Sequence, residues 1–297
     1  MRLIDALILE GDAAEKLKTL DDESVHTCVT SPPYFGLRDY GTAGQIGLEQ
    51  HPKEYVKKLV RVFREVRRVL RDDGTLWLNI GDSYARYGKF TSAKYAGCKQ
   101  KDLIGIPWML AFALRADGWY LRQDIIWQKT NCMPESVRDR CTKSHEYIFL
   151  LSKRPRYYFD AEAISEPIAD SSIKRCMQNI DAQKGSDRQP GKTNGNMKAA
   201  LPRFGGSKYG SDTREEARTK SGAEYIPSLK RNKRDVWSIS TGGFKGAHFA
   251  VFPEKLVEPC ILAGCPVGGT VLDPFAGSGT TGVVAKKVGA KVRRRGD

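Results

Sequence analysis

Two short polar motifs, far apart in the chain, constrain its fold more than any other feature. Thr30-Ser31-Pro32-Pro33-Tyr34 follows an apolar run at residues 25–29, and Asp273-Pro274-Phe275-Ala276-Gly277-Ser278-Gly279-Thr280-Thr281 follows another at residues 270–272. Each motif predicts a tip, fixed by proline or glycine, at the end of a buried strand. Open α/β sheets place their ligand sites at such tips. Because the two tips differ in chemistry, we expect one pocket for a cofactor and, beside it, one for a flat polar group.

The apolar residues between the motifs follow a pattern that predicts alternating helices and strands. Residues 53–70 place valine, leucine and phenylalanine on one helical face, and Asp72-Asp73-Gly74 ends that helix. Further helices are expected over residues 12–20, 107–117 and 253–263, and strands over residues 6–9, 25–31, 75–80, 119–127 and 145–151 and from Val236. This alternation predicts an α/β fold with a Rossmann-like, doubly wound and mostly parallel sheet, covered by helices on both faces.

Length and composition favour one large α/β domain with a smaller segment inserted or appended. The chain has 297 residues, 40% of them hydrophobic, and no apolar run is long enough to cross a membrane. The N-terminus carries acidic residues early and lacks the basic-then-apolar pattern of a secretory signal peptide, so we expect a soluble cytoplasmic protein. Seven cysteines without a C-x-x-C pair, and only four histidines, predict free thiols and no metal site. Cys260 lies within the helical pattern at 253–263 and is expected to be a buried thiol, not a nucleophile.

Positive charge is concentrated in one segment of the chain. There are 49 lysines and arginines against 35 aspartates and glutamates, a net charge of +14, and residues 171–235 hold 15 of the former and 7 of the latter. Such an excess favours a polyanionic partner. Periodicity fails over residues 165–232, where loop-forming residues are frequent. This segment is either a solvated, partly disordered insertion or a basic arm that orders on nucleic acid.

These patterns divide the chain into three expected parts. Residues 1–164 carry the proline tip, residues 165–232 form the basic insertion, and residues 233–297 carry the glycine tip. The candidates for phosphate contacts are the basic residues at the end of the insertion, Lys230, Arg231, Lys233 and Arg234. A basic cluster beside a linker can equally form a solvated hinge.

The glycine tip has the chemistry of an anion-binding turn. A strand, then Gly277-Ser278-Gly279, then a helix beginning near Thr280 would turn backbone N–H groups and a helix N-terminus toward a ligand. With Gly282, the turn also satisfies the dinucleotide pattern G-x-G-x-x-G, and Asp297 follows where a ribose-binding acid is expected. The alternatives are a nicotinamide dehydrogenase and a tight turn without a ligand.

The proline tip offers hydrogen-bond acceptors. Consecutive prolines fix the backbone and remove two N–H donors, which leaves the Ser31 hydroxyl and the Pro32 carbonyl as acceptors. Tyr34 adds a flat face for stacking. Acceptors beside an aromatic ring suit the exocyclic amino group of a planar base. For this tetrapeptide alone, a plain Pro-Pro turn with a packed tyrosine is the simpler interpretation.

Taken together, the two motifs resemble those of the S-adenosylmethionine-dependent DNA amino-methyltransferases. Ser31-Pro32-Pro33-Tyr34 is similar to the catalytic motif of the TSPPY subgroup, and Asp273 to Gly279 is similar to the D-P-F-x-G-x-G cofactor motif. The order of the two motifs resembles the permuted, beta-type arrangement of the class I methyltransferase fold. The resemblance implies cofactor contacts from Asp12, Phe252, Asp273, Phe275, Ala276, Gly277, Ser278, Gly279, Thr280, Thr281 and Asp297, with catalysis by Ser31, Pro32, Pro33 and Tyr34.

The resemblance also implies the reaction. A methyl group would pass from S-adenosyl-L-methionine to the amino group of a base flipped out of double-stranded DNA, without a covalent intermediate. Serine at position 31 is associated with the 4-amino group of cytosine in this family, and aspartate with the 6-amino group of adenine, which remains the alternative. Residues 165–232 would recognise the target sequence. A cognate restriction endonuclease is a candidate partner, and the oligomeric state, monomer or homodimer, is left open.

Other classes of protein share part of this pattern. A non-catalytic nucleic-acid-binding protein would explain the charge but not the glycine tip, and a dehydrogenase would leave the proline tip unexplained. Methyltransferases acting on RNA or on protein glutamine share the motif type. One departure from the family is the arginine-rich end, Arg293-Arg294-Arg295, where an aliphatic strand is expected. Either that strand lies at the sheet margin or this terminus is truncated or altered, and the role of Asp297 depends on which.

Overall fold

The computed structural model describes residues 6–85, 97–171, 230–242 and 252–292, together with short strands at 186–189 and 192–194. The chain divides into two compact units, one formed by Met1–Ala163 with Arg234–Asp297 and the other by Ile164–Lys233. The bounds of the second unit lie within one residue of those expected for the basic insertion. Its role in recognition stays a prediction.

The larger unit is built on a seven-stranded sheet with the strand order β11-β10-β1-β2-β4-β3-β9. Only β4 runs antiparallel to its neighbours β2 and β3, and the other adjacent pairs are parallel. The strands are β1 (Val25–Thr30), β2 (Leu70–Ile80), β3 (Tyr120–Gln128), β4 (His145–Ser152), β9 (Val236–Ser238), β10 (Thr270–Leu272) and β11 (Lys291–Val292). The expected mostly parallel α/β sheet is confirmed.

The topology places a switch point between β10 and β1. From β10 the chain crosses to β11 on one side, and from β1 it crosses to β2 on the other. Parallel strands that diverge in this way leave a crevice at their carboxyl ends, where open α/β sheets bind ligands. The proline tip follows β1 and the glycine tip follows β10. The two motifs therefore stand on opposite sides of the same crevice.

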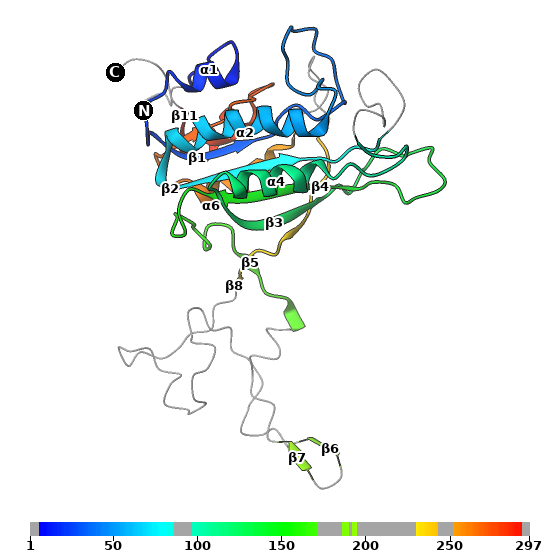
Figure 1. Ribbon diagram of the computed structural model, residues 1–297. Helices are drawn as coiled ribbons and strands as arrows, with labels where there is room; N and C mark the ends of the chain where they lie inside the picture. The colour runs from blue at the N-terminus through cyan, green and yellow to red at the C-terminus, as the bar shows by residue number, and fades with distance from the viewer. Residues whose placement is uncertain are drawn as a thin grey trace. The chain divides into compact units, whose positions relative to one another are not determined.

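Helices cover both faces of the sheet (Figure 1), with α2 and α4 on one face and α6 on the other. They are α1 (Ala13–Leu17), α2 (Pro52–Val69), α4 (Ile106–Ala116), α6 (Glu254–Gly264) and α7 (Thr280–Lys287). Proline occupies the first turn of α2 and of α4, where its missing N–H costs nothing. The apolar stripe of α2 buries Tyr55, Leu59, Phe63 and Val66 against the core. Burial of each such side chain contributes about 1.5–3 kcal/mol.

The opposite face is packed so closely that one helix position requires glycine. A Cβ on Gly264, at the end of α6, would stand 2.6 Å from Trp77 Nε1 and 2.8 Å from Thr27 Oγ1. Cys260 is buried in the same helix, as expected, with its thiol donating to the Leu256 carbonyl at 3.3 Å. Pro259 lies inside α6. This helix is thus a core element, and its cysteine belongs to the packing.

Several expected boundaries were wrong. Residues 6–9 form no strand, and Ile8 is 86% exposed, because no strand in the described part of the chain pairs with this run. Strand β2 begins at Leu70, directly after α2 and five residues earlier than expected, because Leu70 pairs with Val25. Helix α1 ends at Leu17. Strand β11 is an edge strand of the described sheet, as expected if the arginine-rich strand lies at the sheet margin. Residues 293–297 lie outside the described part of the chain.

The smaller unit has little regular structure among its described residues. Strands β5 (Glu166–Pro167) and β8 (Lys230–Arg231) form an antiparallel pair, and β6 (Ser186–Gln189) pairs with β7 (Lys192–Asn194). No helix in the described part of the chain is both long enough and apolar enough to span a bilayer.

Candidate active site

Polar side chains from four strands meet at one edge of the sheet. The carboxyl ends of β1, β2 and β10 lie there with the start of β4, because β4 runs in the opposite direction. This arrangement brings Ser31, Asn79, Glu146 and Asp273 to the same edge, although up to 242 residues separate them in sequence. These four residues come together because strands that are distant in sequence pair with one another in the sheet.

The proline tip is held by contacts on both sides. Tyr55, from α2, donates its hydroxyl to the Pro33 carbonyl at 2.8 Å, which commits that acceptor to the protein. Gly47, with φ of +109°, lies so close that a Cβ would come within 3.0 Å of the Tyr34 carbonyl. Pro32 is buried and Ser31 is partly buried. No described residue donates a hydrogen bond to the Pro32 carbonyl, which leaves this acceptor open, and its role with the Ser31 hydroxyl stays a prediction.

Tyr34 is tethered through its hydroxyl. It donates to Glu146 Oε2 at 2.6 Å, and its ring lies against Gly81, where a Cβ would approach Cε2 to 2.7 Å. Burial and the Glu146 carboxylate raise the pKa of the Tyr34 hydroxyl well above its usual range. The group therefore stays protonated and acts as a donor. Sequence reasoning gave Tyr34 only a stacking face and missed this role of its hydroxyl.

Glu146 joins three elements and was not among the residues expected at the site. Its Oε2 accepts from Tyr34 and, at 3.2 Å, from Asn79 Nδ2, while Oε1 pairs with the Lys129 ammonium. Its side chain is 13% exposed. An asparagine near the end of the buried part of β2 and a glutamate at the start of β4 were the available signals, since buried polar groups need partners.

Asp82 and Lys143, which sequence reasoning also missed, support the same edge of the sheet. Asp82 accepts from the backbone N–H groups of Gly105 and Ile106, both at 3.0 Å, and so caps the start of α4. Lys143 donates to the Asp82 carbonyl at 2.6 Å. Burial lowers the pKa of the Lys143 ammonium, while the charges of Asp82 and Glu146 oppose that shift. Both residues lie on the rim of the site and fix the loop after β2.

The glycine tip is anchored by Asp273. Its Oδ1 accepts from Thr30 Oγ1 at 2.6 Å and from the Phe275 N–H at 3.0 Å, and its Oδ2 accepts from Thr281 Oγ1 at 2.7 Å. Burial raises the pKa of the Asp273 carboxyl, whereas the hydroxyl donors lower it. Because these donors engage both carboxylate oxygens, Asp273 positions the turn and joins it to β1. A direct contact to the cofactor stays a prediction.

The turn itself fits a bound nucleoside-like cofactor. Gly277 and Gly279 have φ of +51° and +78°, which side chains rarely adopt, and a Cβ on Gly279 would meet nothing within 4 Å. Ala276 and Gly277 are exposed, and Ser278 Oγ lies 3.1 Å from Thr280 Oγ1 at the start of α7. Open space beside a left-handed glycine turn allows a ligand to approach the backbone. This observation supports S-adenosyl-L-methionine at this tip.

The remaining cofactor candidates are placed less centrally. Phe252 lines a small cavity with Thr30 and Asn79, and residues of α6 complete its lining. Phe275 packs on the core, 6.5 Å from Phe63 between ring centroids. Asp12 is exposed and caps α1, where it accepts from the Glu15 N–H at 3.0 Å. Asp297 lies outside the described residues.

The four basic candidates differ in their surroundings. Arg231 and Lys233 share the carboxylate of Glu166, at 3.4 and 3.1 Å. Lys230 and Arg234 are exposed. Arg231 and Lys233 therefore stabilise the β5–β8 part of the smaller unit, and a phosphate would have to compete with Glu166 for them. This difference separates the four residues, which the sequence pattern treated alike.

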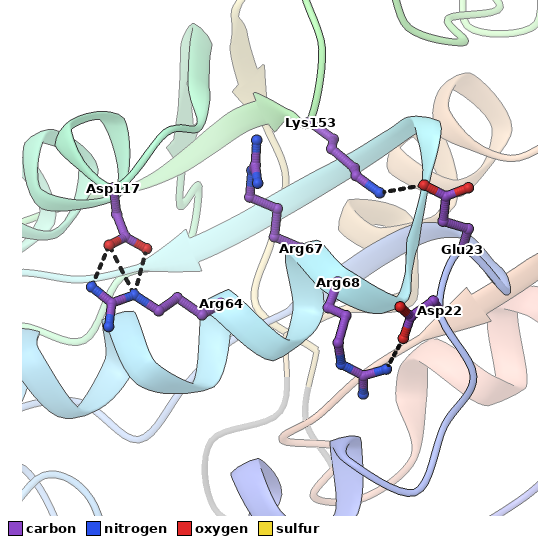
Figure 2. Close-up of a pocket in the computed structure, with 7 residues that line it drawn as sticks. All are labelled: Asp22, Glu23, Arg64, Arg67, Arg68, Asp117 and Lys153. Atoms are coloured by element: carbon purple, nitrogen blue, oxygen red, sulfur yellow. Dashed lines mark hydrogen bonds and ion pairs between the residues drawn. The ribbon is translucent and has the colours of Figure 1, made fainter.

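Another groove lies away from the two motifs. It encloses about 720 Å³ beside the C-terminal half of α2 and is lined by Asp22, Glu23, Arg64, Arg67, Arg68, Asp117 and Lys153. Figure 2 shows Arg64 paired with Asp117, Arg68 with Asp22 and Lys153 with Glu23. It borders the start of β1 and the end of β4, at the edge opposite the two motifs. All of these side chains except Arg67 pair with one another, and the groove lies away from both motifs, so it is not the candidate active site.

Known proteins resemble the chain across both tips. Residues 25–292 match the DNA methylase family of N6 and N4 enzymes. The type II methyltransferase M.SmaI of Serratia marcescens is 46% identical over 95% of this chain and 82% of its own length. The type II methyltransferase M.Cfr9I of Citrobacter freundii is 43% identical over 97% of this chain and 82% of its own.

Solved structures agree on the fold. The cytosine-N4-specific PvuII DNA methyltransferase has a TM-score of 0.58 at 19% identity, covering 95% of this chain and 78% of its own. A Thermus thermophilus protein complexed with S-adenosyl-L-methionine has a TM-score of 0.51 at 23% identity, covering 95% and 84%. The family match contradicts the dehydrogenase and non-catalytic alternatives. The chain belongs to the N6/N4 DNA methylase family and is an S-adenosyl-L-methionine-dependent DNA amino-methyltransferase.

Proposed function

We propose that this DNA amino-methyltransferase methylates the 4-amino group of cytosine. The observation that carries the proposal is the pair of acceptors at the proline tip, the Ser31 hydroxyl and the Pro32 carbonyl, beside the ring of Tyr34. An exocyclic amine has two hydrogens, so two acceptors can engage both of them. A serine hydroxyl in the first position of the motif, where an aspartate is associated with adenine, favours cytosine.

The residues at this edge would act by orienting the amine. Hydrogen bonds from the amino hydrogens to Ser31 Oγ and the Pro32 carbonyl draw the nitrogen lone pair out of conjugation with the ring. S-adenosyl-L-methionine supplies the methyl group on a positively charged sulfur. No protein nucleophile is required, in keeping with the burial of Cys28 and Cys260. Burial and the Asp273 carboxylate also raise the pKa of the Cys28 thiol, which keeps it unreactive.

Access to this pocket requires the base to leave the duplex. A flipped base would stack against Tyr34, whose hydroxyl is already held by Glu146 at 2.6 Å. We assign target recognition to the smaller unit, Ile164–Lys233, because of its charge and its place between the catalytic and cofactor halves. As type II relatives suggest, a restriction endonuclease of the same specificity would be the functional partner, and both would act in the cytoplasm.

One experiment tests the substrate directly. The protein is incubated with tritiated S-adenosyl-L-methionine and unmethylated plasmid DNA, and the hydrolysed nucleosides are separated and identified by mass spectrometry. N4-methyldeoxycytidine is the expected product. N6-methyldeoxyadenosine would establish the adenine alternative, and the absence of label from the DNA would contradict the proposed substrate. Sequencing of the methylated plasmid would also give the recognition sequence.

A further inference from the structure

A chain of hydrogen bonds leads away from the proposed amine acceptor into the sheet. Ser31 Oγ donates to the Tyr34 hydroxyl over a long 3.4 Å, and the Tyr34 hydroxyl donates to Glu146 Oε2 at 2.6 Å. Glu146 is held by Asn79 Nδ2 at 3.2 Å and by the Lys129 ammonium. The chain therefore begins at the proposed substrate pocket and ends on a largely buried carboxylate, which Asn79 on β2 and Lys129, directly after β3, hold in place.

The carboxylate decides which way the hydroxyls point. A hydroxyl can donate or accept, so two hydroxyls in series have no preferred direction by themselves. An ionised carboxylate can only accept, and it obliges Tyr34 to donate toward it. The Tyr34 oxygen then accepts from Ser31, and the Ser31 oxygen is left with its lone pairs toward the pocket. Burial keeps Tyr34 protonated, which preserves this direction.

We propose that Glu146 is a positioning residue that, through Tyr34, makes Ser31 an acceptor for the amino group of the target base. The identity of that base as cytosine rests on the proposed function. A pocket with this fixed direction selects a base that donates at its 4-position over one that accepts there. Cytosine carries an amino group at that position and uracil carries a carbonyl oxygen. Glu146 is thus also a determinant of base selectivity, although it touches no substrate atom.

The substitution Glu146→Gln reverses the direction without changing the shape. The Lys129 ammonium has no acceptor, so it holds the amide oxygen of the new side chain and leaves the amide nitrogen facing Tyr34. Tyr34 then loses its short acceptor and can donate to Ser31, so that Ser31 can donate into the pocket. Asn79 Oδ1, at 3.3 Å from the Tyr34 hydroxyl, is the longer competing acceptor, and wild-type behaviour of the variant would mean that Tyr34 turns to it instead. We expect kcat to fall on the order of a hundredfold, as for loss of an oriented catalytic hydrogen bond, with the Kd for S-adenosyl-L-methionine unchanged.

Binding measurements separate this role from a structural one. Two duplexes carry the mapped recognition site with either cytosine or uracil at the target position, and anisotropy gives Kd for each. The ratio of the uracil Kd to the cytosine Kd should fall about tenfold from wild type to Glu146→Gln, which is about 1.4 kcal/mol of selectivity. A mismatched uracil is easier to flip than a paired cytosine, but this difference is the same for wild type and variant, so it cancels when their ratios are compared.

Two further variants complete the test. Tyr34→Phe breaks the chain, so adding Glu146→Gln in that background should change neither kcat nor the ratio. Glu65→Gln, another partly buried glutamate in an ion pair with Arg68, is the matched control and should behave as wild type. Circular dichroism verifies folding, and if Glu146→Gln does not fold, Tyr34→Phe alone must show the loss of selectivity.

Three outcomes would overturn the inference: wild-type kcat in Glu146→Gln, an unchanged ratio, or an equal further loss in the Tyr34→Phe background. Failure of the proposed function is distinguishable, because it is decided by the nucleoside that the wild-type protein methylates. If that nucleoside is adenine, the same variants are compared on adenine and hypoxanthine duplexes, and the direction of the hydrogen bonds is tested independently of the base.

Discussion

Thr30 Oγ1 donates a hydrogen bond of 2.6 Å to Asp273 Oδ1, and this contact joins the last residue of β1 to the first residue after β10. The residues are 243 positions apart in the chain. Each is the first residue of one of the two motifs, so the contact fixes the proline tip against the glycine tip across the topological switch point. The relative position of the two tips sets the distance between a methyl donor and an acceptor amine, and catalysis depends on that distance.

The first prediction concerns this contact. Thr30→Val keeps the side-chain shape but removes one donor from the buried Asp273 carboxylate, so the free energy of unfolding should fall by roughly 1–3 kcal/mol. Affinity for S-adenosyl-L-methionine should fall as well, because the turn loses its link to β1. Urea denaturation and calorimetric titration measure the two effects. Thr19→Val, at an exposed threonine that donates to the Lys16 carbonyl, is the control and should change stability by less than about 0.5 kcal/mol. Equal stability of the two variants would remove the anchoring role.

The second prediction concerns the glycine turn. Gly279 and Gly289 stand at the two ends of α7, both with φ of +78° and both with open space where a Cβ would be. Substituting valine at either position should cost the same backbone strain, about 1–2 kcal/mol. Only Gly279→Val should abolish binding of S-adenosyl-L-methionine, because only that turn belongs to the proposed cofactor site. Calorimetry on folded protein distinguishes them, with NAD as a ligand that should not bind. Wild-type affinity in Gly279→Val would place the cofactor elsewhere.

The third prediction concerns Ser31. Ser31→Ala removes an acceptor of the amine, so kcat should fall on the order of a hundredfold while the Kd for S-adenosyl-L-methionine stays within about twofold. Single-turnover methylation of plasmid DNA measures the chemical step. Ser24→Ala is a suitable control, since Ser24 bonds to the Asp21 carbonyl just before β1, at the other end of the same strand. Near wild-type turnover of Ser31→Ala would exclude the residue from catalysis.

Local sequence patterns predicted the elements and the two tips, because each depends on periodicity and on the backbone limits of proline and glycine. The strand expected at residues 6–9 was wrong because a short apolar run becomes a strand only where a neighbour pairs with it. Glu146 could not be placed either. Its contact with Tyr34 depends on β4 running antiparallel to β2, a pairing between segments about 70 residues apart that no local pattern encodes. The roles of the site residues themselves still require the experiments above.

The fourth prediction is a pH dependence of stability. His26, on β1, accepts from the Thr270 N–H on β10 through Nδ1 at 2.9 Å, which requires a neutral ring. Burial, and then the charge of Arg71, lower its pKa below the usual 6.5. The unfolded chain thus binds a proton that the folded protein does not, and stability falls as pH drops below about 6.5. His26→Asn keeps an acceptor but cannot titrate, so its stability should fall less steeply from pH 7 to 5. Parallel curves from urea denaturation would exclude His26 as the cause.

The last prediction concerns DNA binding by the basic residues near the end of the smaller unit. Each phosphate contact of a lysine or arginine adds about 0.9 to the slope of log affinity against log salt on duplex DNA. Lys230 and Arg234 are exposed, so replacing both with glutamine should lower that slope by about 1.8. Arg231 and Lys233 already share Glu166, and binding a phosphate would break those pairs.

Replacing Arg231 and Lys233 with glutamine should therefore lower the salt slope less than the first double variant does. It should instead increase proteolysis of the smaller unit, because the variant loses two ion pairs of Glu166. Anisotropy titrations over a range of NaCl concentrations give the slopes, and limited trypsin digestion gives the stability of the unit. An unchanged slope in both variants, with unchanged sequence specificity, would mean that all four residues form a solvated hinge. The phosphate contacts would then have to come from the other lysines and arginines of the chain.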